Sequence, residues 1–188
     1  MMWKGDFDGE RFQSKFDDLA ASGVDVHGEA SFVASLEPSS VLDAGCGTGR
    51  VAIELARRGI AVVGVDVDES MLTTAKSRAP EIEWILHDVA TLDLGRTFDV
   101  VVMAGNVPLF TPAESQAALI AGCARHVAPG GVLVAGFQTQ RENRRYSIEQ
   151  YDAHCAAAGL ELSERYSTWD RQAFVAGGDY AVSVHRRR

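Results

Sequence analysis

The chain has 188 residues, of which 46% are hydrophobic and 23% are charged, a composition typical of one globular domain. Its 26 acidic and 18 basic residues give a net charge of −8, which argues against the broad positive surface that DNA or RNA binding requires. We therefore expect a partner other than nucleic acid, and the acidic balance is compatible with a monomer or a dimer.

The cysteines and the first residues of the chain indicate its compartment. Cys46, Cys123 and Cys155 are far apart and form no Cys-x-x-Cys pair, which predicts neither a disulfide framework nor a metal site. Acidic residues interrupt the first eight positions, where a signal peptide would carry apolar residues. No apolar run approaches the roughly 18 residues that cross a membrane. We expect a soluble, cytoplasmic protein without a bound metal.

The first 38 residues predict two helices. Phe12, Phe16 and Leu19 recur at helical spacing and would form one apolar face. Residues Phe32–Leu36 would form a second apolar face, and Pro38 ends that helix. We expect both helices to cover one side of a larger core, as a lid.

From residue 39, short apolar runs alternate with helical stretches. The runs that predict strands are Val41–Ala44, Ala61–Val65, Ile82–Leu86, Val100–Ala104 and Val132–Phe137. The stretches that predict helices are Arg50–Arg58, Glu69–Arg78, Pro112–Val127 and Ser147–Ala158. This alternation predicts an α/β fold with a doubly wound, mostly parallel sheet and helices on both of its faces.

The end of the chain breaks the alternation. Leu160–Trp169 and Asp179–His185 predict two strands with no helix between them, and therefore an antiparallel hairpin at one sheet edge. The sheet would then have seven strands. We expect a single domain, with a helical lid (1–38), a core (39–137), and a C-terminal helix and β-hairpin (138–188).

The most informative stretch is the glycine loop Asp43-Ala44-Gly45-Cys46-Gly47-Thr48-Gly49, which follows a predicted strand and opens a helix. Glycines let the backbone turn sharply and approach a ligand closely. Asp66 ends the next predicted strand, where a carboxylate can accept both hydroxyl hydrogens of a ribose. This context predicts a nucleotide-binding loop.

The spacing of the glycines bears on which nucleotide is bound. Dinucleotide loops read Gly-x-Gly-x-x-Gly, whereas this loop reads Gly-x-Gly-x-Gly, and Asp43 would repel a pyrophosphate. A carboxylate at that position suits an ammonium group or backbone N–H donors. An NAD-dependent oxidoreductase remains the alternative, but its commonest short-chain form needs Tyr-x-x-x-Lys, and no lysine follows Lys76.

The loop resembles the first motif of the class I S-adenosylmethionine-dependent methyltransferases. Four later segments resemble further motifs of that family, in the family's order. They are Val63–Leu72, His87–Val89, Phe98–Met103 and Val127–Leu133. The resemblance covers residues 39–137. It implies a Rossmann-like fold, a cofactor-binding core, S-adenosyl-L-methionine as the cofactor and S-adenosyl-L-homocysteine as the product.

The resemblance also implies roles for single residues. The loop backbone would line the methionine part of the cofactor, Asp66 would hold the ribose, and Met71, Asp88 and Val89 would surround the adenine. We read Cys46 as a small spacer in the loop. The cofactor-binding residues that we expect are Asp43, Gly45, Cys46, Gly47, Gly49, Asp66, Val67, Met71, Asp88, Val89, Met103, Ala104 and Asn106.

No catalytic residue is predicted. Methyl transfer is an in-line displacement at a carbon that the sulfonium already activates, so the enzyme need only align the nucleophile and exclude water. Gly105–Phe110 partly resembles the Asn-Pro-Pro-aromatic motif of amino-group methyltransferases. Because Val107 and Leu109 depart from that motif, we favour a loop that lines the cofactor.

Substrate should enter at the carboxyl ends of the fourth and fifth strands, beneath the N-terminal helices. Aromatic residues of the lid suit a sulfonium or a flat substrate, although a place in the helix core is an equal alternative for two of them. A histidine before the second helix is either a base or structural. The candidate substrate residues are Trp3, Phe12, Phe16, His27, Asn106 and Tyr146.

Tyr146 stands with Arg141, Arg144 and Arg145 after the fifth predicted strand. These arginines either attract an acidic substrate or form a solvated loop. Because the core and a short lid leave no recognition domain, we expect methyl transfer to a small molecule. The remaining alternatives are the oxidoreductase and a non-catalytic protein that binds adenosyl ligands.

Overall fold

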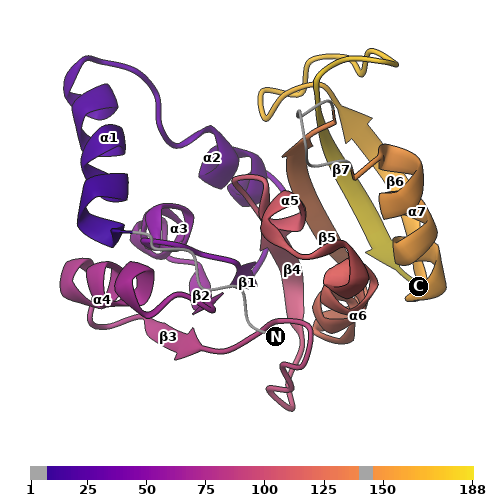
Figure 1. Ribbon diagram of the computed structural model, residues 1–188, viewed down its shortest axis with the longest axis horizontal. Helices are drawn as coiled ribbons and strands as arrows, with labels where there is room; N and C mark the ends of the chain where they lie inside the picture. The colour runs from indigo at the N-terminus through magenta and orange to yellow at the C-terminus, as the bar shows by residue number, and fades with distance from the viewer. Residues whose placement is uncertain (1–7, 140–145) are drawn as a thin grey trace.

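The computed structural model describes residues 8–139 and 146–188. Within these ranges one seven-stranded sheet has the strand order β3-β2-β1-β4-β5-β7-β6 (Figure 1). β7 is antiparallel to β5 and β6, and the other neighbouring strands are parallel. The strands are β1 (Ser40–Ala44), β2 (Ala61–Asp66), β3 (Glu83–Leu86), β4 (Phe98–Met103), β5 (Val127–Gln138), β6 (Leu160–Tyr166) and β7 (Tyr180–Arg187). The predicted doubly wound sheet with a terminal antiparallel hairpin is confirmed.

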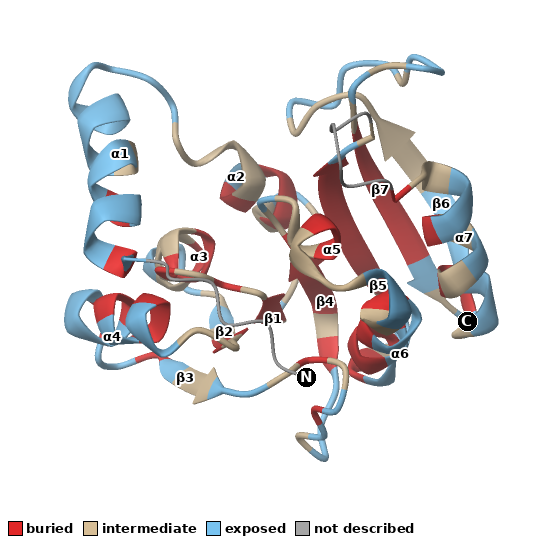
Figure 2. Ribbon diagram, in the orientation of Figure 1, coloured by how far each residue is buried: buried red, intermediate tan, exposed pale blue. Residues whose placement is uncertain are grey.

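Helices lie on both sides of this sheet. They are α1 (Gly9–Ala21), α2 (Gly28–Ala34), α3 (Arg50–Arg57), α4 (Glu69–Arg78), α5 (Val107–Phe110), α6 (Gln116–Arg125) and α7 (Ile148–Ala157). Of these, α1 packs on another helix instead of on the strands. Along β1, Leu42 and Ala44 pack beneath α6 and α7, whereas Val41 faces α2 and α3. Because both faces of the central strands are buried, β1, β4 and the second half of β5 read as continuous apolar runs, whereas the edge strands β3 and β6 are mostly exposed or half-buried (Figure 2).

Three element boundaries differ from the sequence prediction by more than two residues. β5 begins at Val127 because Pro129-Gly130-Gly131, predicted as a break, forms an irregularity inside the strand. The predicted helix Pro112–Val127 starts only at Gln116, after a 3₁₀ turn and the unpredicted α5. β6 ends at Tyr166, and residues 167–179 form the connection to β7.

The apolar residues of the first helix are not its buried side, although the Phe12 and Phe16 rings contact each other, with centroids 5.3 Å apart. α1 buries Gly9 and Gln13, whereas Phe12 is 36% and Leu19 44% exposed. The helix lies on α4 and the glycine loop instead of the sheet (Figure 1), and its contacts there are polar. Gln13 Oε1 accepts from Thr48 Oγ1 at 2.5 Å, and Arg78 donates to both carboxylate oxygens of Asp17. Helical spacing alone therefore identified the helix but not its buried side.

No helix in the described ranges is long and apolar enough to cross a membrane.

A glycine in α6 sets the distance between this helix and the loop after β3. Gly122 is buried, and a Cβ atom there would overlap the backbone carbonyl oxygen of Val89. Unlike a side chain, the backbone of Val89 cannot rotate to another rotamer to avoid this overlap. Gly122 therefore fixes the place of Val89, one of the expected adenine-contacting residues.

We expect Gly122→Ala to lower the free energy of unfolding by about 1–3 kcal/mol through overpacking. A glycine-to-alanine change in a helix usually raises stability, because alanine is favoured over glycine by about 1 kcal/mol. Here we expect the opposite effect. Urea denaturation measures the effect, with the exposed neighbour Ala121→Gly as a control that should lose about 1 kcal/mol. A Gly122→Ala protein as stable as the parent would contradict the close approach.

Candidate functional site

A cavity of about 250 Å³ opens at the carboxyl ends of β1, β2 and β4. The sheet changes direction here, because β2 and β4 flank β1 and their connections cover opposite faces. Many of the expected residues line the cavity together. They are Asp43, Gly45, Cys46, Gly47, Asp66, Val67, Met71, Asp88, Val89 and Ala104, with Phe12 and Phe16 from α1.

Backbone hydrogen bonds fasten the glycine loop to the end of β2. The N–H groups of Gly45 and Cys46 donate to the Val65 carbonyl at 2.8 and 3.0 Å. The N–H group of Gly47 donates to Asp66 Oδ2 at 2.7 Å. Asp66 Oδ1 also accepts from the N–H group of Asp68 at 2.9 Å. The loop and the carboxylate that we expected to hold the ribose are therefore one hydrogen-bonded unit.

Gly49 has a role other than the expected contact with the cofactor. It precedes α3 with φ of +80° and does not line the cavity. A Cβ atom there would overlap the ring of Trp84, whose Nε1 donates to the Ala79 carbonyl at 2.8 Å. The sequence analysis missed Trp84, because nothing in its own segment marks a contact with the distant loop.

Asp43 carries a buried carboxylate at the bottom of the cavity. The residue is 1% exposed, and neither carboxylate oxygen has a hydrogen-bond partner in the described chain. Burial raises the pKa of Asp43 to about 7, against the opposing effects of the Arg50 guanidinium and of the nearby backbone N–H group of Ala52. Buried polar groups are normally hydrogen-bonded, so these oxygens indicate a missing donor.

Burial also affects the other titratable groups of the loop. It raises the pKa of Asp66, although the N–H groups of Asp68 and Gly47 counteract this effect. It raises the pKa of the Cys46 thiol well above its usual value, and the carboxylates of Asp43 and Asp66 add to the effect. A thiol that stays protonated is a poor nucleophile, which supports the spacer role of Cys46.

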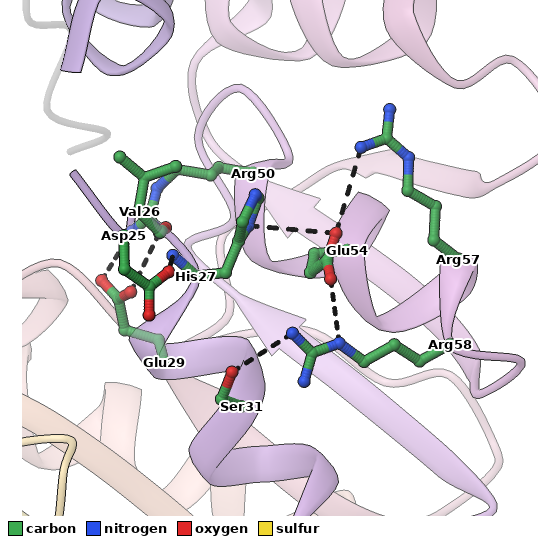
Figure 3. A network of polar contacts seen from close by, with 9 residues as sticks. All are labelled: Asp25, Val26, His27, Glu29, Ser31, Arg50, Glu54, Arg57 and Arg58. Carbon is green, nitrogen blue, oxygen red and sulfur yellow. Dashed lines mark hydrogen bonds and ion pairs between the residues drawn. The ribbon is translucent and has the colours of Figure 1, made fainter. Parts of the chain in front are cut away.

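The first residue of α3 joins the cavity wall, although the sequence analysis did not select it. The Arg50 guanidinium donates to both Glu29 carboxylate oxygens, at 2.9 and 2.6 Å, and to the Val26 carbonyl (Figure 3). It also lies over the Phe16 ring, 4.6 Å from the centroid. Its place directly after the loop is the only sequence signal that marked it.

Like Gly49, two further expected cofactor residues, Met103 and Asn106, do not line the cavity. Met103 is fully buried in the core beneath the sheet. The Asn106 side chain accepts from the Gln138 N–H group at 2.7 Å, which ties the loop after β4 to β5. The backbone of this loop still contributes, since Gly105 and Val107 line the cavity.

His27 and Tyr146 lie away from the cavity. His27 Nδ1 is 3.9 Å from Glu54 Oε2, on the side of α3 shown in Figure 3. Tyr146 is 1% exposed, packs against Phe137 and Tyr151, and its hydroxyl contacts His154 Nδ1 at 2.7 Å. The prediction that Tyr146 contacts substrate is thus corrected, because its ring fills the core. Trp3 and the arginines at 141, 144 and 145 lie outside the described residues.

Several lining residues were missed. They come from the loop after β1, from α3 and the start of α4, and from the segment that contains α5 and the 3₁₀ turn Ala113–Ser115. These residues are Thr48, Arg50, Val51, Asp68, Gly105, Val107, Phe110, Thr111, Pro112, Ser115 and Leu119. Thr48 lies in the glycine loop, Asp68 lies in the motif segment Val63–Leu72, and Gly105, Val107 and Phe110 lie in the segment that the sequence predicted to line the cofactor, so these segments were marked although the residues were not selected. The other residues belong to no motif.

Comparison with known proteins identifies the family. A family model for the methyltransferase domain matches residues 41–131. The crystal structure of a TehB-like SAM-dependent methyltransferase from Corynebacterium glutamicum superposes with a TM-score of 0.88 and 31% identity, over 96% of this chain and 98% of that one. The chain belongs to the class I S-adenosylmethionine-dependent methyltransferases. The family's methyl donor is S-adenosyl-L-methionine.

Other members differ in length and in the reactions that their names describe. The CcbJ methyltransferase from Streptomyces caelestis is 26% identical, with a TM-score of 0.77 over 86% of this chain and 94% of that one. A dTDP-3-amino-3,4,6-trideoxy-α-D-glucopyranose N,N-dimethyltransferase from Streptomyces venezuelae is 36% identical over 119 residues, which are 60% of this methyltransferase chain and 50% of the relative. The chain thus spans about half the length of the curated relatives that it matches.

The buried carboxylate of this methyltransferase should make the cofactor-free protein less stable as the pH rises. The unfolded chain releases the Asp43 proton near pH 4, whereas the folded chain releases it near pH 7. Stability is therefore lost between these values and is constant above them. We expect Asp43→Asn to remove a loss of about 2–3 kcal/mol between pH 5 and pH 8.

Urea unfolding of both proteins at several pH values, without cofactor, measures this difference. The carboxyl group of Asp66 is present in both proteins, so its own burial affects both curves, whereas its repulsion of Asp43 is part of the difference that is measured. Parallel stability curves for the parent and Asp43→Asn would show that Asp43 ionises normally in the folded protein.

Proposed function

We propose that this methyltransferase binds S-adenosyl-L-methionine in the cavity at the glycine loop and transfers its methyl group to a small-molecule acceptor. The observation that carries the proposal is the pair of buried, unpartnered oxygens of Asp43 at this loop. The methionine part of the cofactor carries an ammonium group. An ammonium group offers three N–H donors and a positive charge, so it supplies what Asp43 lacks.

Asp66 fits the ribose of the same ligand. Each of its carboxylate oxygens already accepts one backbone N–H group, from Gly47 or Asp68. A carboxylate oxygen has two acceptor sites, so one remains on each oxygen for a ribose hydroxyl. The backbone bonds hold the carboxylate in place before the ligand arrives, which reduces the entropy lost on binding.

The far end of the cavity fits an adenine ring. Met71, Val67 and Val89 supply apolar contacts. Asp88 Oδ1 accepts from the Ala90 N–H group at 2.9 Å, which orients the carboxyl group and leaves Oδ2 without a partner in the described chain. That oxygen suits the adenine amino group.

The bound cofactor supplies a methyl group activated by its sulfonium. The residues of the chain contribute position and the exclusion of water. No histidine, lysine or tyrosine is among the described residues that line the cavity, which agrees with catalysis by alignment. Phe12 and Phe16 close the cavity on the side of α1.

The names of relatives support a small acceptor. They include amino-sugar N,N-dimethyltransferases and ubiquinone biosynthesis O-methyltransferases. Because both nitrogen and oxygen acceptors occur among these names, they do not assign the attacked atom. Family membership favours methyl transfer over the oxidoreductase alternative.

Calorimetric titration with S-adenosyl-L-methionine, S-adenosyl-L-homocysteine and NADH tests the cofactor. We expect the two adenosyl ligands to bind and NADH to give no heat, and NADH binding alone would overturn the proposal. Release of S-adenosyl-L-homocysteine over panels of small amines, phenols, acids and thiols tests turnover. Tight cofactor binding without release of S-adenosyl-L-homocysteine in any panel would favour a non-catalytic adenosyl-binding protein.

We expect Asp66→Asn to weaken adenosyl-ligand binding at least tenfold (on the order of 1.4 kcal/mol). An amide has one acceptor oxygen where the carboxylate has two, so it cannot serve Gly47, Asp68 and both ribose hydroxyls. Calorimetry measures the affinity. Asp93→Asn, at an exposed aspartate in the loop after β3, is the matched control and should bind like the parent. Unchanged affinity in Asp66→Asn would show that the ribose lies elsewhere.

A further inference from the structure

A second depression, of about 620 Å³, lies between α2 and the 167–179 connection of β6 and β7. Both segments lie near the edge of the sheet at which the cavity opens (Figure 1). Its volume is within the range of small-molecule sites, roughly 300–1,000 Å³. We call it the acidic groove, after its acidic and aromatic lining residues Asp25, Glu29, Trp169, Asp170, Asp179 and Tyr180.

The groove carries unbalanced negative charge. None of the described residues that line it is basic. Glu29 is neutralised by Arg50, at 2.6 Å, and Asp25 accepts from the backbone N–H group of His27. The side chains of Asp170 and Asp179 have no hydrogen bond or ion pair in the described chain, and both are exposed. The described lining of the groove therefore favours a cation over an anion.

Two aromatic rings of the groove are held in fixed positions. Trp169 Nε1 donates to the Tyr180 hydroxyl at 3.0 Å. The indole also packs against Gly136 of β5 and meets the Phe32 ring at a centroid distance of 5.5 Å. Aromatic faces attract cations, so these rings and the carboxylates favour the same kind of ligand.

A hydroxyl group in the groove also lacks a partner. Thr168 Oγ1 is a buried atom with no hydrogen-bond partner in the described chain, and Thr168 lines the groove. Because this oxygen is closed to solvent, a molecule in the groove does not contact it, and the choice of ligand rests on the charges and the aromatic rings.

The groove and the cofactor cavity share a wall. Glu29 lines the groove and Arg50 lines the cavity. The two residues form an ion pair (Figure 3). Tyr180 pairs with Gln138 at the carboxyl end of β5, which is where substrate is expected. A molecule bound in the groove thus lies next to the proposed cofactor.

We propose that the acidic groove binds the cationic end of the methyl acceptor, an organic ammonium group attached to an apolar body. The inference rests on the proposed function, because it assigns the groove to the acceptor of that reaction. A protonated amine has no lone pair with which to attack the methyl group. The ammonium group is therefore the part of the acceptor that is recognised, and another atom of the same molecule receives the methyl group.

Three probes of the same ring and different charge test the groove: benzylammonium, benzyl alcohol and benzoate. Each is titrated into the full chain with and without S-adenosyl-L-homocysteine, and backbone amide NMR shifts report the affinity and the place of binding. We expect benzylammonium to bind at least about fivefold more tightly than benzyl alcohol, and benzoate most weakly. The shifts should fall on residues 167–180 and 25–29.

Asp170→Asn/Asp179→Asn should weaken benzylammonium binding about fivefold and leave benzyl alcohol unchanged. Both side chains are exposed, so the variant should fold. Asp18→Asn/Glu81→Gln removes the same charge at exposed positions that do not line the groove, and it should bind like the parent.

Equal affinities for the three probes, tighter binding of benzoate, equal losses in both double variants, or shifts outside the groove would each overturn the inference. Affinity for S-adenosyl-L-homocysteine is measured separately. If the parent protein does not bind S-adenosyl-L-homocysteine, the proposed function is refuted. If it binds this ligand but does not prefer benzylammonium, only the assignment of the groove to the acceptor is refuted.

Discussion

The N–H groups of Gly45 and Cys46 converge on one carbonyl, that of Val65, while the next N–H donor of the loop reaches the Asp66 carboxylate. These bonds join the ends of β1 and β2 through backbone atoms, and the other walls of the cavity are arranged around them. The Trp84 ring packs against Gly49 of the loop, and Gly122 sets the position of Val89 in the cavity wall. A change in this junction would move the proposed ribose, methionine and adenine positions together.

The same junction places a carboxylate where the folded chain alone does not satisfy it. Asp43 is buried without a partner, and its pKa is raised because burial disfavours the charged form. The cofactor-free protein is less stable for this reason, and a ligand with an ammonium group would relieve the cost. Preorganised binding sites commonly carry such local instability, because the group is positioned for the ligand and not for the fold.

Charge is divided between two neighbouring spaces at this edge of the sheet. In the Arg50–Glu29 ion pair, the cation lines the cofactor cavity and the anion lines the acidic groove. The pair compensates Glu29, so the remaining negative charge of the groove comes from Asp25, Asp170 and Asp179. Part of the net charge of −8 is thus concentrated in the carboxylates of the cofactor cavity and of the acidic groove.

The sequence by itself determined the parallel sheet, its terminal hairpin, the glycine loop and the aspartates Asp43, Asp66 and Asp88, because each depends on spacing within one segment. Only the tertiary structure decided which side of α1 is buried, that Tyr146 belongs to the core, and that Asn106 binds the backbone of β5. It also decided that Arg50 joins the cavity and that residues from α2 and the 167–179 connection form one groove. These features depend on contacts between segments far apart in the chain, and periodicity and local motifs do not specify such contacts.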